Sequence, residues 1–155
     1  MNAVQPIPDD YPRVTPYLHV VGAADALEFY RNVFGATERG GRMEGPDGTV
    51  MHAEIEIGSS LIMVADEFPD MDAYAPGHFG GTPVSIHVYV EDAEATFAAA
   101  LAAGATSLND VADQFYGDRI GTFKDPWGHK WHVSSRVEEV SEEEMRKRMA
   151  AQQQS

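Results

Sequence analysis

The sequence repeats itself once, and this repeat constrains the fold more than any other feature. The stretch HVVGAADALEFYRNVFGAT, residues 19–37, aligns with VYVEDAEATFAAALAAGAT, residues 88–106, at an offset of 69 residues. Gly35-Ala36-Thr37 falls on Gly104-Ala105-Thr106 in this alignment. A single repeat of this length within 155 residues indicates two copies of one supersecondary unit.

Each copy begins with a run that predicts a strand, TPYLHVV in the first and PVSIHVYV in the second. A helix is expected next, because apolar residues recur at helical spacing. In the first copy these residues are Ala26, Phe29, Tyr30, Val33 and Phe34. In the second copy they are Ala93, Phe97, Ala100 and Leu101. Gly35 and Gly104 then end the two helices.

Further strands follow the helix in both copies. The expected strands are TERGGRMEG, VMHAEIEIG and SLIMVAD in the first copy, and ATSLNDV, RIGTFKD and HKWHVSS in the second. The fold class is therefore α+β: two tandem βαβββ modules forming a curved mixed sheet with a cleft, followed by a C-terminal helix. Module one covers about 13–66, a Gly- and Pro-rich linker 67–83, and module two about 84–136, so that 1–136 form a single domain.

The acidic tail, residues 137–155, predicts a helix, since Ser141 and Glu144 have the spacing of a capping box. Met145 and Met149, four residues apart, are expected to dock this helix. Eleven basic against 25 acidic residues give a formal charge of −14, which disfavours nucleic acid as a partner. No apolar run is long enough to span a membrane, and the chain has no cysteine. A cytoplasmic protein is expected.

The two modules resemble the vicinal oxygen chelate superfamily, the glyoxalase/bleomycin-resistance/dioxygenase group, and in particular its PhnB-like branch. The resemblance extends from about Val14 to Arg136. It is carried by PYLHVVGAADALEFYRNVFGA, VMHAEIEIGSSLIMVADE, YVEDAEATFAAALAAGA and DQFYGDRIGTFKDPWGHKW. It implies the fold, but the superfamily includes isomerases, ring-cleaving dioxygenases, thiol transferases and drug-binding proteins without catalysis.

The resemblance also implies where a divalent metal would bind. Metal-using members take one ligand from the first and one from the last strand of each module. Those positions fall on Pro16, on Ile62 or Met63, on Ser85 and on His132. Only the histidine is a good ligand for a hard or borderline divalent ion, so no cofactor is expected.

Strand alternation leaves one alternative open. It places Ser85, His87 and Tyr89 on one face of their strand, and His52, Glu54 and Glu56 on one face of theirs. A divalent metal held by His52, His87 and His132 would make the protein a lyase, isomerase or dioxygenase with a non-standard site. By contrast, His19 is expected on the helix-packed face of its strand.

The stretch QFYGDRIGTFKDPWGHKWHV, residues 114–133, suggests the wall of a site. The resemblance implies an aromatic-Gly-x-Arg element like the one with which drug-binding members line their ligand groove, whereas the alternative is a scaffold role. For Asp125, Pro126 and Gly128 the scaffold role is favoured. The expected cleft residues are His52, Glu54, His87, Tyr89, Phe115, Tyr116, Arg119 and His132.

The favoured function is therefore a small-molecule-binding protein that holds a planar or hydrophobic ligand in this cleft. The metal-dependent enzyme is the alternative, and a protein whose main role is interaction is the third possibility. A homodimer is also expected, because each module leaves a sheet edge that can pair with another chain. The linker is long enough for either intrachain or exchanged pairing of modules.

Overall fold

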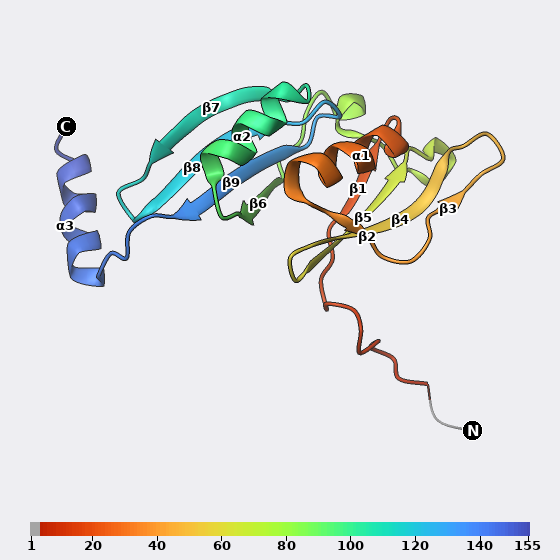
Figure 1. Cartoon of the computed structure of the whole chain (residues 1–155), viewed down its shortest axis with the longest axis horizontal. Coiled ribbons are helices and arrows are strands. Elements are labelled where there is room, and N and C mark those ends of the chain that lie inside the picture. Colours follow the sequence, from red (N-terminus) through yellow and green to blue (C-terminus); the bar gives the residue numbers. More distant parts are fainter. Residues whose placement is uncertain (1–3) are drawn as a thin grey trace. The chain divides into compact units, whose positions relative to one another are not determined.

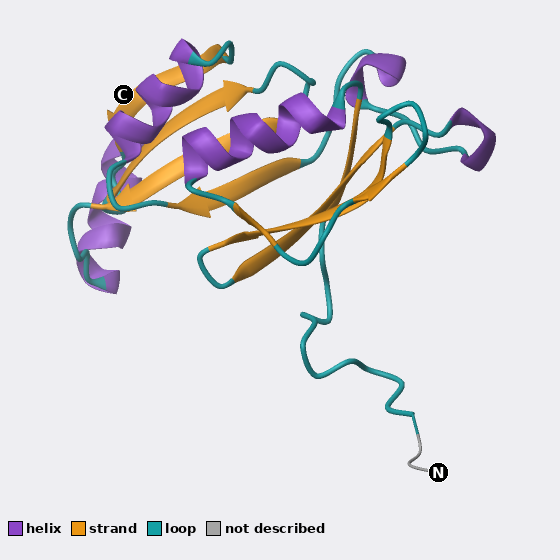
Figure 2. Ribbon diagram, turned by 45° about the vertical axis from the view of Figure 1, so that its right-hand side comes forward, coloured by secondary structure: helices purple, strands orange, loops and turns teal. Residues whose placement is uncertain are grey.

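A computed structural model describes residues 4–155 and divides the chain into two compact units, the first ending at Gly80 and the second running from Gly81 to Ser155. Each unit has its own sheet with a helix on one face (Figures 1 and 2). No helix of the described residues is long and apolar enough to cross a membrane. The mixed α+β class predicted from the repeat is confirmed, as two separate sheets rather than one.

The first unit contains one helix and five strands. Its elements are β1 (Tyr17–Val20), α1 (Ala23–Phe34), β2 (Thr37–Glu38), β3 (Met43–Glu44), β4 (Val50–Ile57) and β5 (Ser60–Asp66). The strands lie in the order β1-β5-β4-β2, and β3 pairs with a further part of β4. β1 is parallel to β5, whereas β4 is antiparallel to β5 and β2. The predicted strand TERGGRMEG is split into β2 and β3, since Gly40 has a positive φ that interrupts it.

The helix of the first unit is fixed to its sheet by a buried apolar layer and by one carboxylate. Tyr30 of α1 is fully buried, and so are Val20, Ile55 and Val64 of the sheet. Asp66, at the end of β5, accepts hydrogen bonds from the amides of Gly22 and Ala23 at the helix start, at 2.8 and 2.9 Å. Gly35 ends α1 in the left-handed conformation, as predicted.

Residues 67–80 contain two short 3-10 helices, Pro69–Met71 and Pro76–Phe79. Each begins with a proline, whose fixed φ suits the first helical position. This segment is part of what the sequence presented as a linker, and the structure gives it local order.

The second unit repeats the arrangement of the first. Its elements are β6 (Ser85–Tyr89), α2 (Ala93–Ala102), β7 (Thr106–Asp113), β8 (Asp118–Lys124), β9 (Lys130–Arg136) and α3 (Glu142–Gln152). The strand order is β6-β9-β8-β7. As in the first unit, the first strand is parallel to the last and the other pairs are antiparallel.

The core of the second unit lies between α2 and the sheet. Trp131 and Phe123 are fully buried, and the Phe123 ring meets that of Phe97 on α2 with centroids 6.3 Å apart. At Gly121 a Cβ atom would lie 2.6 Å from the Phe97 ring. The helix therefore sits close to the sheet at this glycine, and Phe123 and Gly121 mark the helix-covered face of β8.

The C-terminal helix α3 begins as predicted but is held differently. The Ser141 hydroxyl accepts a hydrogen bond from the Glu144 amide, which confirms the predicted cap. Neither methionine is buried, and Met149 is 46% exposed, so the expected docking by methionines is wrong. Arg148 holds the helix instead, since it donates to the Phe115 carbonyl at 3.0 Å and to both carboxylate oxygens of Glu138.

Candidate functional site

In each unit the face of the sheet opposite the helix is open and carries polar side chains. On β4, Ala53 and Ile55 are buried toward α1, and His52 and Glu54 alternate with them. On β6 the side chains of His87 and Tyr89 are exposed. Strand alternation thus predicted correctly which faces of β4 and β6 are open.

On the open face of the second unit, His87 and His132 lie side by side. They are register partners on the parallel strands β6 and β9, and their ring centroids are 5.9 Å apart. The Tyr89 ring is 5.0 Å from that of His87. The Thr122 hydroxyl lies 2.8 Å from Nδ1 of His132. Three of the predicted site residues therefore share one face.

The pKa of His132 on this face is shifted. Burial lowers its pKa below the ordinary histidine value, and the positive charge of Lys130 and the neighbouring His87 lower it further. The ring is therefore neutral at neutral pH. Because Nδ1 bonds to Thr122, Nε2 is the nitrogen without a hydrogen-bond partner in residues 4–155.

A groove of about 490 Å³ adjoins His132. It lies over β7, β8 and the turn between them. Its lining residues are Asn109, Asp110, Ala112, Gln114, Tyr116, Ile120, Thr122 and His132. Of the predicted site residues, Tyr116 and His132 line this groove together. The polar residues of β7 were not foreseen, since the pattern ATSLNDV carries no sign that its side chains border a groove.

The hydroxyl of Tyr89 is already engaged. It donates to Asp118 at 2.7 Å, and this hydrogen bond is the main reason why the pKa of Tyr89 is raised. Asp118 also lies 3.4 Å from the Ser134 hydroxyl and 3.8 Å from Arg136. Only 5% of Asp118 is exposed, so it belongs to the sheet rather than to a surface pair with Arg119.

Arg119 is not where the aromatic-Gly-x-Arg element predicted it. Its guanidinium binds both carboxylate oxygens of Asp113, at 2.6 and 3.2 Å, and comes within 4.0 Å of Glu94 on α2. It shares the helix-covered face of β8 with Gly121 and Phe123, because alternate residues of a strand lie on one face. The prediction that Arg119 lines a groove together with His132 is corrected accordingly.

Phe115 is a neighbour of the groove and not one of its lining residues. Its ring meets the Tyr116 ring edge-on, with centroids 5.2 Å apart. Its carbonyl accepts the hydrogen bond from Arg148 that holds α3. Phe115 thus supports Tyr116 and links the β7–β8 turn to the C-terminal helix.

The open face of the first unit holds a continuous chain of hydrogen bonds. The Tyr17 hydroxyl lies 2.7 Å from Nδ1 of His52, and Nε2 of His52 lies 3.2 Å from Oε1 of Glu54. Tyr11 donates its hydroxyl to the same oxygen at 2.6 Å. His19 stacks on Tyr17 with centroids 4.9 Å apart. His19 is therefore on the open face, and its predicted position against the helix is wrong.

The carboxylate of Glu54 stays ionised in this chain. Burial acts to raise its pKa, but hydrogen bonds from Tyr11 and His52 outweigh burial, so that the pKa is lowered overall. The hydrogen bond to Glu54 is in turn the main cause of the raised pKa of Tyr11. Tyr11 is therefore a protonated donor and Glu54 a charged acceptor.

The residues at the four positions that the resemblance implies do not fit a divalent metal. Ile62 is only 4% exposed, whereas Met63 pairs with Glu54 and lies on the open face. Pro16 has no donor atom in its side chain. The other three positions offer the thioether of Met63, the hydroxyl of Ser85 and the imidazole of His132, which together are not a donor set for zinc, nickel or iron.

The histidines do not replace that set within either unit. His52 belongs to the first unit, and His87 and His132 belong to the second. No group of three or more His, Cys, Asp or Glu residues with the geometry of a metal site was found among residues 4–155. The pair His87 and His132 offers two imidazoles, one fewer than the three protein ligands of catalytic zinc sites.

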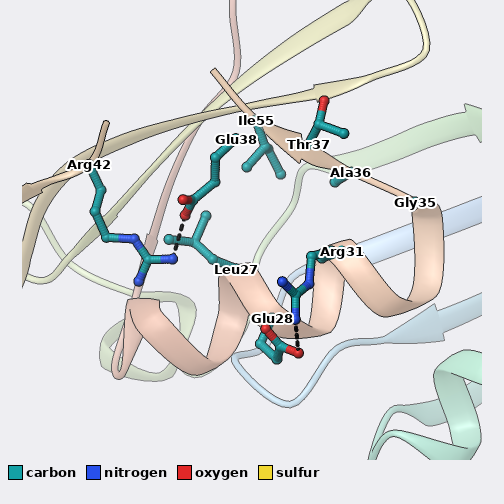
Figure 3. A pocket seen from close by; sticks show the side chains of 9 residues that line it. All are labelled: Leu27, Glu28, Arg31, Gly35, Ala36, Thr37, Glu38, Arg42 and Ile55. Atoms are coloured by element: carbon teal, nitrogen blue, oxygen red, sulfur yellow. Dashed lines mark hydrogen bonds and ion pairs between the residues drawn. The ribbon is translucent and has the colours of Figure 1, made fainter. Parts of the chain in front are cut away.

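A second hollow, of about 390 Å³, lies on the helix side of the first unit (Figure 3). Leu27 and Ile55 contribute apolar atoms to it. Its two arginines, Arg31 and Arg42, are paired with Glu28 and Glu38 respectively. Because both arginines are already paired with carboxylates of the hollow, they are less suited to bind a ligand than the side chains of the groove beside His132.

Comparison with known proteins places this fold in a family. Residues 15–133 match the model of the Glyoxalase/Bleomycin resistance protein/Dioxygenase superfamily. An uncharacterized protein of Mycobacterium bovis, Mb0911c, is 42% identical over 144 residues, which are 91% of this chain and 94% of that protein.

Solved structures share the fold at lower identity. Protein PA1353 from Pseudomonas aeruginosa superimposes with a TM-score of 0.65 at 24% identity, over 83% of this chain and all of that one. A PhnB protein from Bacillus cereus, described as a putative 3-demethylubiquinone-9 3-methyltransferase, gives a TM-score of 0.60 at 22% identity, over 80% and 99% of the two chains. The chain belongs to the glyoxalase/bleomycin resistance protein/dioxygenase superfamily, and PhnB-like proteins are among its structural neighbours.

Proposed function

We propose that the protein binds a planar small molecule in the groove that Tyr116 and His132 line. The observation that carries the proposal is the composition of this groove. Its volume of about 490 Å³ lies in the range of small-molecule sites, roughly 300–1,000 Å³. An exposed aromatic ring, an apolar side chain and an imidazole border the same space, which suits a ligand with one flat face and a polar edge.

Each lining residue has a distinct part in this proposal. Tyr116 offers a ring for stacking, and Ile120 offers apolar contact. His132 is oriented through Nδ1 by Thr122 and offers Nε2 to a hydrogen-bonding group of the ligand. Since its pKa is lowered, it serves as a neutral donor or acceptor rather than as a cation. Binding of this kind needs no metal or cofactor.

The proposal is tested in two steps: a screen identifies a ligand, and isothermal titration calorimetry then compares its affinity for the wild type and for variants of the groove. A thermal-shift screen of planar aromatic acids, amides and heterocycles identifies a ligand, which at hundredfold excess over its Kd stabilises the protein by about 2.7 kcal/mol. Tyr116→Ala and His132→Ala are each expected to weaken binding about fivefold, since each removes one stacking or hydrogen-bonding partner worth about 1 kcal/mol. EDTA is expected to leave the affinity unchanged.

Arg119→Ala is the matched control. Arg119 lies on β8 close to Ile120 and Thr122, but its side chain binds Asp113 on the helix side of the sheet. Its removal is expected to leave the affinity unchanged. Wild-type affinity in both Tyr116→Ala and His132→Ala, or a loss confined to Arg119→Ala, would contradict the proposed groove.

We also propose that the protein forms a homodimer. Among the described residues, β1 pairs only with β5, and β6 and β7 each pair with one strand, so these strands have an unpaired edge. Such edges favour pairing with a second chain, and a twofold dimer is the commonest closed assembly. Light scattering after size exclusion is expected to give about twice 16.9 kDa. A monomer mass at tens of micromolar protein would contradict this expectation.

A further inference from the structure

Tyr11 occupies a specific position on the open face of the first unit. Its hydroxyl donates to Oε1 of Glu54 at 2.6 Å, and the guanidinium carbon of Arg39 lies 4.6 Å from the centre of its ring. Arg39 is oriented by Asp10, whose carbonyl and carboxylate accept from Nη1 and Nη2 at 2.8 and 2.7 Å. The phenol ring is thus held at its hydroxyl and at its face.

The carboxylate that accepts from Tyr11 is also held by groups of the sheet. Glu54 projects from β4 with only 12% of its side chain exposed, and Nε2 of His52 lies 3.2 Å from its Oε1. Tyr17 of β1 fixes the other nitrogen of His52 at 2.7 Å. The carboxylate is therefore positioned and largely buried, and a carboxylate acceptor forms strong hydrogen bonds with a hydroxyl donor.

The part of the chain around Tyr11 is attached to the sheet through side chains, and the backbone bond to the sheet lies further on, from the Met63 amide to the Pro16 carbonyl at 2.9 Å. Residues 4–16 contain no helix or strand. Within the described residues, the backbone bond of Tyr11 is a local one from its amide to the Pro8 carbonyl at 3.4 Å. A tethered group of this kind competes with a free ligand as if it were present at a high local concentration, and a free ligand can displace it.

We propose that Glu54, His52 and Arg39 form a second small-molecule site, selective for phenols, which the chain's own Tyr11 fills. The chemistry that recognises the ligand is a carboxylate acceptor for the phenolic hydroxyl and a guanidinium over the ring. The site belongs to the first unit and does not depend on the groove beside His132. A phenol enters it by replacing Tyr11.

The test measures binding of p-cresol, which is the side chain of tyrosine, by NMR titration. Tyr11→Ala is expected to bind p-cresol at least tenfold more tightly than the wild type, because the internal competitor is removed. Tyr11→Phe keeps the ring without its hydroxyl, and its affinity is expected to fall between the two. Toluene, which lacks the hydroxyl, is expected to bind none of the three measurably.

Variants of the site locate the bound probe. In the Tyr11→Ala background, Glu54→Gln and Arg39→Met are each expected to weaken p-cresol binding at least tenfold, and the His52 ring signals should shift on titration only while Glu54 is present. His132→Ala serves as the control and is expected to leave p-cresol affinity unchanged. The proposal for Tyr11 and the proposal for the groove beside His132 can therefore be refuted independently. Equal affinity in wild type and Tyr11→Ala would overturn the proposal, as would unchanged binding in Arg39→Met.

Discussion

Replacing Asp125 by alanine is expected to lower the free energy of unfolding by about 3 kcal/mol or more, since the buried donors it serves would be left without an acceptor. The residue is only 2% exposed. Its Oδ1 accepts from the amides of Trp127 and His129 at 3.0 and 2.9 Å, and its Oδ2 accepts from Nε1 of the buried Trp131 at 2.9 Å. One carboxylate thus fixes both the β8–β9 turn and a large core side chain.

Urea unfolding followed by circular dichroism measures this effect. Asp125→Asn is expected to lose less stability than Asp125→Ala, because the amide keeps one acceptor oxygen. Asp70→Ala removes an exposed carboxylate and is expected to change stability by less than about 0.5 kcal/mol. A loss of under 1 kcal/mol in Asp125→Ala would show that the hydrogen bonds of this turn contribute little to the fold.

The fold could be predicted because its main signal is redundant. Two aligned copies each carry a strand, a helix with apolar residues and a terminating glycine, and the alternation in VMHAEIEI and SIHVYV separates the open face from the helix face. The scaffold role predicted for the turn at residues 125–128 also agrees with the contacts of Asp125. Alternation with a period of two residues is a local property of the sequence, so the faces of a strand can be assigned without knowing which strands it pairs with.

Strict alternation gives the observed faces of Arg119, a predicted site residue, and of His19, which was predicted to pack against the helix. In β8 the residues Phe123, Gly121 and Arg119 share a face by alternation, and Phe123 packs on α2. The resemblance to an aromatic-Gly-x-Arg element implies a groove position for Arg119, whereas alternation alone places it with Phe123 and Gly121. In β1 the same counting from the buried Leu18 and Val20 turns His19 outward.

The contacts of Tyr11 could not be predicted from the sequence. The residue lies in a proline-rich stretch without periodicity, and its partner Glu54 is 43 residues away. No strand or helix pattern relates the two positions. Recognition of this kind depends on how a coil segment lies across a sheet, which is a tertiary property.

Gly117 is expected to tolerate no side chain, although its place beside Phe115 and Tyr116 suggested a ligand-binding element. Its φ is +100°, and a Cβ atom would lie 2.2 Å from the Glu138 carbonyl oxygen. Its own carbonyl accepts from the amides of Val137 and Glu138 at 2.9 and 3.1 Å. The glycine thus lets the β7–β8 turn meet the segment that leads to α3.

We expect Gly117→Ala to destabilise the protein by roughly 2–4 kcal/mol, the sum of left-handed backbone strain and a contact that only backbone movement can relieve. Gly58→Ala separates the two contributions, because Gly58 has a φ of +58° and no atom within 4 Å of a built Cβ. That variant is expected to lose only the strain, about 1–2 kcal/mol. Equal losses in urea unfolding would mean that the 137–138 segment moves aside freely. A larger loss at Gly117 would show that the close approach itself is what requires glycine there.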